Sequence, residues 1–315
     1  MSQWDDAALT VAFAHRLRHN ELLSRHSTFH VGGPADLFLT THTAEELESA
    51  VRLAGAAGIP VRVLGSGANI LPSDAGVRGL VIRNVSRRFL LEADGNQMTV
   101  ESGMVLPVLA RRTARAGLDG LTWGCGVPGT VGGAVANNAG CYGASVSDHL
   151  VSVRTVNAAG EVRDWSAASL QFSYRSSPFK AKAGGEPAIK AAILGATFAL
   201  PAGDAQALLA QVARWLEQRA ATQPLDHPSA GSFFKNPPGD FAGRLIEAAG
   251  LKGLAHGEAQ VSAKHANFFV NQGHASATDL FLLAREVRQA VEQRTGVRLE
   301  REVELIGAWD DVADL

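Results

Sequence analysis

Residues 120–143 read GLTWGCGVPGTVGGAVANNAGCYG, and this glycine-rich stretch decides how the rest of the chain is interpreted. Glycine has no side chain, so its backbone adopts left-handed turns and can lie flush against a flat or anionic ligand. Thr130, Asn137 and Asn138 add short polar groups that can reach phosphate or ring heteroatoms. A disordered glycine segment would not be interleaved with residues such as Trp123. We therefore expect an ordered ligand-binding loop rather than a strand, with a structural glycine turn as the alternative.

Length and composition indicate a globular protein. The chain has 315 residues, of which 46% are hydrophobic, so it can bury a sizeable core in two or three compact units. Its 29 Lys and Arg against 31 Asp and Glu give a net charge of -2, so no strong field favours nucleic acid or a membrane surface. No apolar run is long enough to span a bilayer, and the N-terminus lacks the pattern of a signal peptide. We expect a cytoplasmic monomer without nucleic-acid or membrane partners.

The cysteines and the acidic residues give no sign of a metal. The two cysteines, Cys125 and Cys141, are too few for a disulfide framework or a structural zinc site. A reactive thiol usually has a histidine or a helix start beside it, so we favour buried free thiols. Histidine and acidic residues nowhere stand at metal-ligand spacing, and we expect no metal site.

Periodicity and turn signals predict an α+β chain. Residues 150–156 and 161–165 flank a turn and predict an antiparallel hairpin. In residues 296–307, alternation predicts a final strand with Glu300 and Glu302 on one face. The predicted helices cover 7–23, 44–57, 105–116, 205–222, 242–250 and 279–294. The other predicted strands cover 35–40, 61–64, 79–82, 98–101 and a segment ending at Asn271.

A second glycine loop follows the predicted strand 61–64. Residues 65–71 read GSGANIL, and a strand that opens into such a loop is typical of a phosphate cradle. The loop is not the dinucleotide fingerprint G-x-G-x-x-G, because position 70 is Ile and no helix begins before Pro72. This disfavours a nicotinamide-binding Rossmann unit. An ordinary tight turn stays open as the alternative.

Two polar blocks lie further along the chain. Tyr174 and Arg175 precede Pro178, and the planar fork of arginine suits a carboxylate or a phosphate, although a solvated surface cation is the commoner case. Ser232 lies in HPSAGSFFKNP, residues 227–237, without the G-x-S-x-G motif or poised histidine of a nucleophile. We interpret Ser232 as a hydrogen-bond or proton donor. A turn satisfied by its own serine and asparagine side chains is the alternative.

Six blocks in order resemble one family, and the similarity covers nearly the whole chain. They are residues 27–36 (STFHVGGPAD), 65–71, 127–133 with 138–140, 174–175, 228–237 and 299–303 (LEREV). They are similar to the UDP-N-acetylenolpyruvoylglucosamine reductases, flavoenzymes of bacterial cell-wall synthesis. The resemblance implies a two-lobed FAD-binding domain of the vanillyl-alcohol oxidase type over 1–200, with lobes at about 24–85 and 86–200. It further implies a substrate-binding domain over 201–307, followed by an acidic tail, 308–315.

The resemblance also implies the site. It assigns catalysis to Arg175, Ser232 and Glu302, with Glu300 as the fallback for Glu302. Non-covalent FAD contacts are expected at Gly65, Ser66, Gly67, Ala68, Asn69, Ile70, Val127, Pro128, Gly129, Thr130, Gly132, Gly133, Asn138 and Gly140, and substrate contacts at Tyr174, Lys235 and Asn236.

The implied reaction reduces UDP-N-acetylglucosamine enolpyruvate to UDP-N-acetylmuramate. NADPH reduces FAD, and hydride passes from N5 to the terminal carbon of the enolpyruvyl ether. Arg175 pairs with the substrate carboxylate, and Ser232 donates a proton to the adjacent carbon. Glu302 contributes a hydrogen bond if it is protonated, which requires a raised pKa in a dry site. NADPH and the UDP-sugar are expected to take turns in one pocket.

The sequence departs from the family pattern at a few positions. Glu258 stands where a glycine is more usual, and Ala68 replaces a common serine. The short segment between Lys180 and Ile193 resembles the type that lacks an extra tyrosine-bearing loop. Two alternatives stay open, namely an oxidase with flavin attached through His30 or Cys141, and a nucleotide-binding module without catalysis.

Overall fold

The computed structural model describes residues 4–92, 97–180 and 186–309. Contacts divide the chain into two compact units, each built from separate stretches. The first unit comprises Met1–His19, Leu37–Ser66 and Gly79–Glu217, and the second comprises Asn20–Asp36, Gly67–Arg78 and Gln218–Leu315. The sequence predicts an FAD-binding domain over 1–200 and a substrate-binding domain over 201–307. These limits are defined by what each domain binds, so they stay a prediction.

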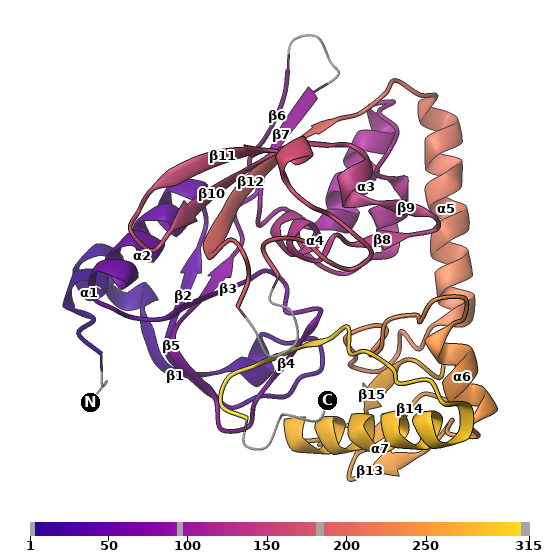
Figure 1. Ribbon diagram of the computed structural model, residues 1–315. Helices are drawn as coiled ribbons and strands as arrows, with labels where there is room; N and C mark the ends of the chain where they lie inside the picture. Colours follow the sequence, from indigo (N-terminus) through magenta and orange to yellow (C-terminus); the bar gives the residue numbers. More distant parts are fainter. Residues whose placement is uncertain (1–3, 93–96, 181–185, 310–315) are drawn as a thin grey trace. The chain divides into compact units, whose positions relative to one another are not determined.

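The first unit is built around a five-stranded antiparallel sheet (Figure 1). Its strands, in spatial order, are β11 (Val162–Ser166), β10 (Leu150–Asn157), β12 (Ala191–Ala199), β7 (Gln97–Glu101) and β6 (Phe89–Leu91). The pairing of β10 with β11 confirms the predicted hairpin. Alternate residues such as Met98 and Val100 are buried, so one face of the sheet carries the core.

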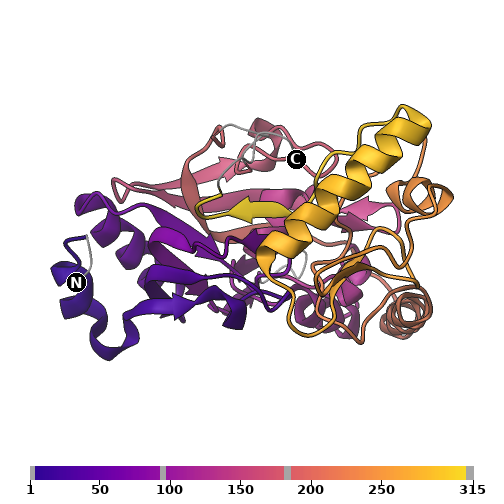
Figure 2. The same ribbon diagram turned by 90° about the horizontal axis from the view of Figure 1, so that it is seen from below.

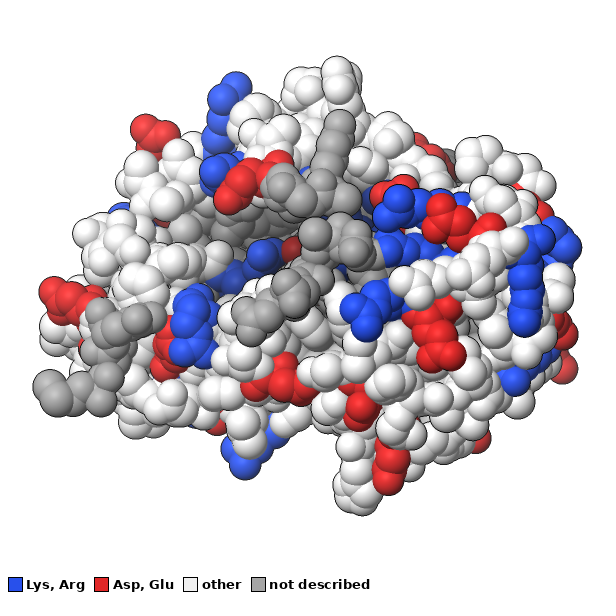
Figure 3. Space-filling view, turned by 60° about the horizontal axis from the view of Figure 1, so that its bottom comes forward, with Lys and Arg blue, Asp and Glu red and all other residues white. Residues whose placement is uncertain are grey.

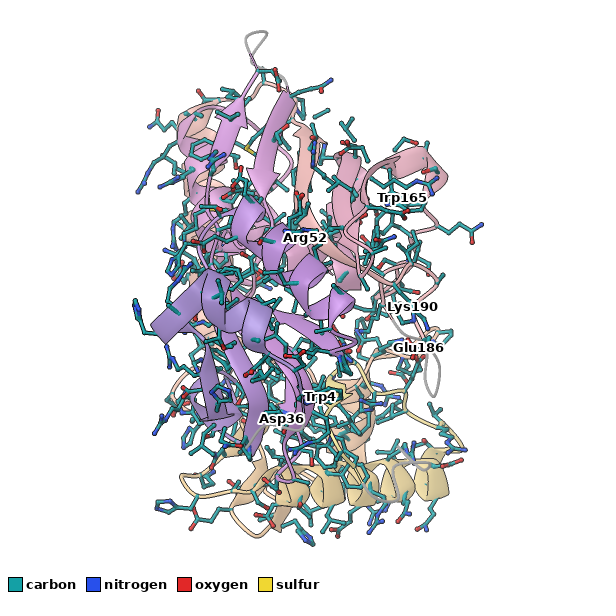
Figure 4. All side chains as sticks on the ribbon, turned by 90° about the vertical axis from the view of Figure 1, so that its left-hand side faces the viewer. Trp4, Asp36, Arg52, Trp165, Glu186 and Lys190 are labelled. Atoms are coloured by element: carbon teal, nitrogen blue, oxygen red, sulfur yellow. The ribbon has the colours of Figure 1, made fainter. Side chains whose placement is uncertain are left out.

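Within the described residues, three helices of this unit are longer than the rest. Helix α2 (Ala44–Ala56) begins where expected, because the Thr43 hydroxyl accepts the Glu46 N–H at 3.1 Å. Figure 4 labels Arg52 on α2 and Trp165 on β11, and the Arg52 stem packs against Gly160 in the turn before β11. The other two are α3 (Leu106–Arg115) and α5 (Ala205–Thr222), joined by buried Ala110, Ala114, Leu208 and Val212 (Figure 1).

A four-stranded sheet has the order β1-β2-β5-β3. Its inner strands β2 and β5 are the long ones, and β3 runs parallel to β5. The bounds are β1 (Arg18–Leu22), β2 (Pro34–Thr41), β5 (Val77–Asn84) and β3 (Val61–Leu64).

The second unit packs helix α7 (Ala277–Thr295) over small sheets (Figure 2). A capping box between Ser276 and Asp279 begins α7, and the Asp74 carboxylate accepts the N–H groups of Ala277 and Thr278, both at 2.9 Å. The remaining elements are α6 (Ala242–Ala248), the antiparallel strands β13 (Ala255–His256), β14 (Ala259–Val261) and β15 (Phe269–Asn271), and the parallel pair β4 (Ile70–Pro72) and β16 (Glu304–Ile306).

Two predicted elements were too long. The predicted helix 7–23 is wrong beyond Phe13. Helix α1 (Ala7–Phe13) stops before Ala14, whose φ is 47°, and the later residues form β1, which pairs with β2. The predicted strand 296–307 is wrong except for β16. Leu299 and Val303 are buried on one side as the alternation predicts, but Ile306, expected on the face of Glu300 and Glu302, is buried as well.

The stretch 120–143 is ordered as expected, but it is not a loop throughout. It contains a 3-10 helix, Thr122–Gly126, helix α4 (Val131–Asn137) and strand β8 (Gly140–Cys141), which pairs with β9 (Ala144–Ser145). The prediction missed α4 because three of its seven residues are Gly or Asn, which have low helix propensity. Short 3-10 helices also occur at Ala14–Arg16, Leu23–Arg25, Val146–Asp148 and Ala167–Ser169.

Surface charge matches the balanced composition. Figure 3 shows Lys and Arg interspersed with Asp and Glu on the face that it draws. Within the described ranges, no helix combines the length and apolarity needed to cross a membrane, and no group of three or more His, Cys, Asp and Glu is placed to hold a metal ion.

Candidate active site

Glycine is required at two positions of the loop 65–71. A Cβ on Gly65 would lie 2.1 Å from Oγ1 of Thr130, so the two glycine-rich stretches meet here at a distance that no side chain allows. Gly67 has a φ of 67°, and a Cβ there would lie 2.0 Å from the carbonyl oxygen of His26. The loop therefore follows a path that only glycine can take.

The polar groups of this loop divide into two kinds. The Ser66 hydroxyl oxygen is buried and has no hydrogen-bond partner among the described residues. Asn69 is engaged, because its Nδ2 donates to the Glu302 carbonyl at 3.3 Å and its carbonyl accepts the Glu304 N–H at 3.0 Å. Ala68 and Ile70 are buried. A buried hydroxyl without a partner is costly, so Ser66 is the group here that is suited to a ligand.

The second glycine stretch presents open backbone before α4. Val127 and Pro128 lead into Gly129, which has a φ of 143° and no atom within 4 Å of where a Cβ would be. Gly132 is close-packed, since a Cβ there would lie 2.9 Å from the Ser102 Cβ, and its N–H donates to the Ser102 carbonyl at 2.8 Å. Gly133 has space, because the nearest atom to its Cβ position is Thr130 Oγ1 at 3.7 Å.

Arg175 lies on a tight turn in a conformation that is unusual for its residue type. Ser173 and Ser176 exchange backbone hydrogen bonds of 3.1 and 3.0 Å, and Arg175 between them has a φ of 54°. Its guanidinium Nη2 donates to the Gly140 carbonyl at 2.9 Å. A bulky residue with positive φ is strained, and such strain clusters at functional sites.

Helix α4 and the segment after it hold this turn. Asn138, at the end of α4 with a φ of 41°, donates from Nδ2 to the Ser173 carbonyl at 3.0 Å. Lys180 Nζ donates to Asn137 Oδ1 at 2.6 Å, and Ser177 Oγ donates to the Ala136 carbonyl at 2.6 Å. The structure therefore brings Arg175 together with Asn138 and Gly140, two residues expected to contact FAD. Tyr174 is 56% exposed on the same turn.

Ser232 and Glu302 lie on adjacent segments of the second unit. Ser232 forms an isolated bridge with Phe268, and the carbonyl of the next residue, Phe233, accepts the Glu302 N–H at 2.8 Å. Asn267 holds this segment, because its Oδ1 accepts the Phe234 N–H at 3.0 Å and its Nδ2 donates to the Phe234 carbonyl at 2.8 Å. Sequence reasoning missed Asn267, whose only signal was an asparagine inside an otherwise apolar run.

Two of the residues expected to bind substrate, Lys235 and Asn236, make contacts within the protein. The Lys235 ammonium forms an ion pair with the Glu300 carboxylate, and the Lys235 N–H donates to the Glu300 carbonyl at 2.8 Å. Asn236 Oδ1 accepts the Ala242 N–H at 3.0 Å and so caps α6. Glu300, the fallback acid, is therefore already engaged with Lys235.

Two basic residues of this unit have lowered pKa values. Burial lowers the pKa of His265, and its Nδ1 accepts the Asn267 N–H at 3.3 Å, which requires the neutral ring. Burial also lowers the pKa of Arg301, whose Nη1 donates to the Val303 carbonyl at 2.8 Å. The desolvation of these cations is the common cause. Lys264 lies at the surface, where its Nζ donates to the Ala220 carbonyl at 2.7 Å.

The thiols and His30 differ in exposure. Cys125 is buried as expected, whereas Cys141 is only half-buried, and neither forms a disulfide. Beside Cys141, the Tyr142 ring stacks on Trp215 with a centroid distance of 3.8 Å. His30 is exposed, with a φ of 58°. The segment 181–185, within the short loop noted from the sequence, lies outside the described residues.

Family models match both parts of the chain. The model described as "FAD binding domain" matches residues 35–166, and that described as "UDP-N-acetylenolpyruvoylglucosamine reductase, C-terminal domain" matches residues 223–306. These matches confirm the expected α+β combination of an FAD-binding domain and a second, C-terminal domain of the reductase.

Relatives match over nearly their full length. The chain is 44% identical to UDP-N-acetylenolpyruvoylglucosamine reductase 2 of Symbiobacterium thermophilum, over 93% of this chain and 92% of the relative. It is 40% identical to the reductase of Carboxydothermus hydrogenoformans, over 95% of this chain and 97% of the relative. The crystal structure of the reductase from Thermus caldophilus superposes with a TM-score of 0.77 at 36% identity, covering 92% of this chain and 99% of that one.

Proposed function

Because the chain belongs to the UDP-N-acetylenolpyruvoylglucosamine reductase family, we propose that it reduces UDP-N-acetylglucosamine enolpyruvate to UDP-N-acetylmuramate with electrons from NADPH. Membership makes it an oxidoreductase of peptidoglycan synthesis with an FAD-binding domain. This favours the reductase over the oxidase and the non-catalytic module. The cytoplasmic location is part of the proposal.

The two glycine-rich stretches fit a flavin dinucleotide held without a covalent bond. At Gly65 and Gly67 the first loop carries no side chain, and Gly129 leaves the backbone of the second stretch open. The buried Ser66 hydroxyl offers a donor that lacks a partner among the described residues. Such a surface suits a diphosphate and a flat ring. The chemistry that FAD supplies when bound is hydride transfer, from NADPH and then to the enolpyruvyl group.

The observation that carries the proposal is the strained turn at Arg175, which directs a guanidinium to Gly140 in the second glycine stretch. An enolpyruvyl carboxylate accepts hydride poorly unless its growing negative charge is stabilised. We assign that role to Arg175, which can form two parallel hydrogen bonds with the carboxylate. The positive φ of Arg175 is consistent with a side chain positioned before the substrate arrives.

Ser232 and Glu302 complete the proposed chemistry. The Ser232 hydroxyl donates a proton to the carbon next to the carboxylate, since the enolate formed by hydride addition is a strong base. Glu302 hydrogen-bonds the substrate carboxylate in its protonated form. The ion pair between Lys235 and Glu300 supports Glu302 rather than Glu300 for this role. Tyr174, Lys235 and Asn236 are proposed substrate contacts.

Replacing the serine and measuring the two half-reactions separately tests the proposal. In Ser232→Ala, flavin reduction by NADPH is expected to stay near the wild-type rate, while reoxidation by the enolpyruvyl substrate slows by about 100- to 10,000-fold. Ser229→Ala, in the same polar block, is the control and keeps both rates. An equal loss in both half-reactions of Ser232→Ala would contradict the role as proton donor.

A further inference from the structure

Strand β6 is an exposed apolar edge. It is the last strand in the order β11-β10-β12-β7-β6, with only β7 beside it within the described part of the sheet (Figure 1). Its three residues are hydrophobic, and Phe89, Leu90 and Leu91 are 38%, 62% and 47% exposed. An apolar edge strand is a template for another strand, and proteins normally cover or charge such an edge.

The backbone of β6 offers hydrogen bonds on its outer side. The Arg88 carbonyl accepts the Glu101 N–H at 2.9 Å, and the Glu92 N–H donates to the Gln97 carbonyl at 2.8 Å, so residues 88, 90 and 92 bond toward β7. In an antiparallel ladder, the residues between them direct N–H and C=O the other way. Phe89 and Leu91 therefore present their donors and acceptors to the open edge.

The charges at the ends of β6 suit a second copy of the strand as its partner. Arg88 precedes the apolar triplet and Glu92 follows it, and both are exposed. If a copy of the strand lies antiparallel with Leu90 opposite Leu90, then Arg88 of each copy faces Glu92 of the other, and Phe89 faces Leu91. Opposite charges across a strand pair are favourable. We propose that β6 pairs in this register with β6 of a second copy of this chain, giving a two-fold symmetric dimer.

The two faces of the sheet agree with this register. Directly opposite residues in an antiparallel pair point to the same face. Arg88, Leu90 and Glu92 share the solvent face with Thr99, which pairs with Leu90 and contacts Thr197 at 3.1 Å. Phe89 lies on the other face, where the Arg112 guanidinium carbon lies over its ring, 5.1 Å from the ring centroid. Each face therefore continues across the dimer, as an isologous interface requires. The proposed dimer differs from the monomer expected from the sequence.

Sedimentation of the full chain over a range of concentrations tests the proposal. The wild type is expected to pass from monomer to dimer as concentration rises. Leu90→Glu places two like charges opposite each other at the symmetry axis, so it is expected to stay monomeric. Val11→Glu is the control, because Val11 is an equally apolar residue on α1, 86% exposed, and its variant is expected to dimerise normally. A wild type that is monomeric at every concentration, or a dimer that survives Leu90→Glu, would overturn the proposal.

A charge exchange tests the register. Arg88→Glu and Glu92→Arg each place like charges opposite each other, and each is expected to weaken self-association about tenfold at low salt. In a mixture of the two variants, one chain carries two acidic residues at positions 88 and 92 and the other carries two basic residues there. Both cross-strand contacts then join opposite charges, so heterodimers are expected at wild-type affinity.

The rescue separates the register from a local effect of the substitution. Arg88 also forms an exposed ion pair with Glu45 at 3.2 Å, which Arg88→Glu removes. Loss of that pair cannot account for the rescue, because the variant still lacks it in the mixture. Absence of rescue would exclude this register.

Discussion

The proposed catalytic residues are held in two different ways. Arg175 lies on a turn fixed by polar contacts, with Asn138 bonded to Ser173 and the guanidinium bonded to Gly140. Ser232 precedes Phe233, which is fully buried and stacks on Phe269 with a centroid distance of 4.6 Å. A single hydrogen bond contributes about 1 kcal/mol net to stability, whereas a buried aromatic ring contributes several kcal/mol. We conclude that changes at the turn should affect chemistry first and changes beside Ser232 should affect folding first.

The largest effect is expected from removing the aromatic ring that supports Ser232. Phe233→Ala removes a fully buried ring, and we expect the free energy of unfolding to fall by about 3–5 kcal/mol. Phe241→Ala is the control, since Phe241 is 67% exposed, and its loss should lie within about 0.5 kcal/mol. Urea unfolding measures both. Equal losses would remove the difference between the two regions.

The next largest effect is expected from a change at the Arg175 turn that slows the reaction without unfolding the protein. Arg175→Lys keeps the charge but loses the planar fork, so we expect flavin reoxidation by substrate to slow by roughly 100- to 1,000-fold. The free energy of unfolding should change by less than about 0.5 kcal/mol. Arg154→Lys, at an exposed pair with Asp164, is the control and should leave reoxidation unchanged. Stopped-flow absorbance and urea unfolding give the two readouts, and a loss of stability without a loss of rate would reverse the comparison.

A smaller loss of stability is expected from removing the asparagine that holds the segment beside Ser232. Asn267→Leu leaves the N–H and C=O of Phe234 without their side-chain partner, which should cost about 1–3 kcal/mol of unfolding free energy. Asn138→Leu also removes two side-chain contacts, with the Ser173 carbonyl and the Ser147 N–H, and we expect it to cost less stability because Ser173 is exposed and water can replace its partner. Thermal unfolding of both variants decides the order, and a larger loss in Asn138→Leu would contradict it.

The smallest effect is a pH dependence. Burial lowers the pKa of His265, so the unfolded chain takes up a proton there before the folded chain does, and stability falls as pH drops below the ordinary histidine value of about 6.5. His265→Gln should lose less stability than the wild type between about pH 7.5 and 5.5, while exposed His42→Gln should lose as much. Parallel losses in wild type and His265→Gln would exclude this contribution.

Local signals were sufficient for part of the fold. Helix α2 follows from the Thr43 cap and its apolar period, and the hairpin of β10 and β11 follows from alternation around a turn. Residues 296–303 misled the prediction because their partners are distant in sequence, as with the Glu302 N–H on the Phe233 carbonyl. A strand pattern alone does not show whether a partner strand exists.

The candidate site was predictable through motif resemblance, but its supports were not. The resemblance pointed to Arg175, Ser232 and Glu302, whose roles stay a proposal. Asn267 and Lys180 act through contacts with Phe234 and Asn137, and such contacts exist only once the chain has folded. The strain at Arg175 is equally invisible in the sequence, because nothing there sets its φ to 54°.

The absorbance of the bound flavin near its visible maximum tests the central claim most directly. The purified protein, reduced without oxygen by one equivalent of NADPH, should lose its yellow colour and regain it when one equivalent of UDP-N-acetylglucosamine enolpyruvate is added, with UDP-N-acetylmuramate as the product. A protein that carries no flavin, or a reduced flavin that stays colourless after the enolpyruvyl substrate is added, would contradict the account.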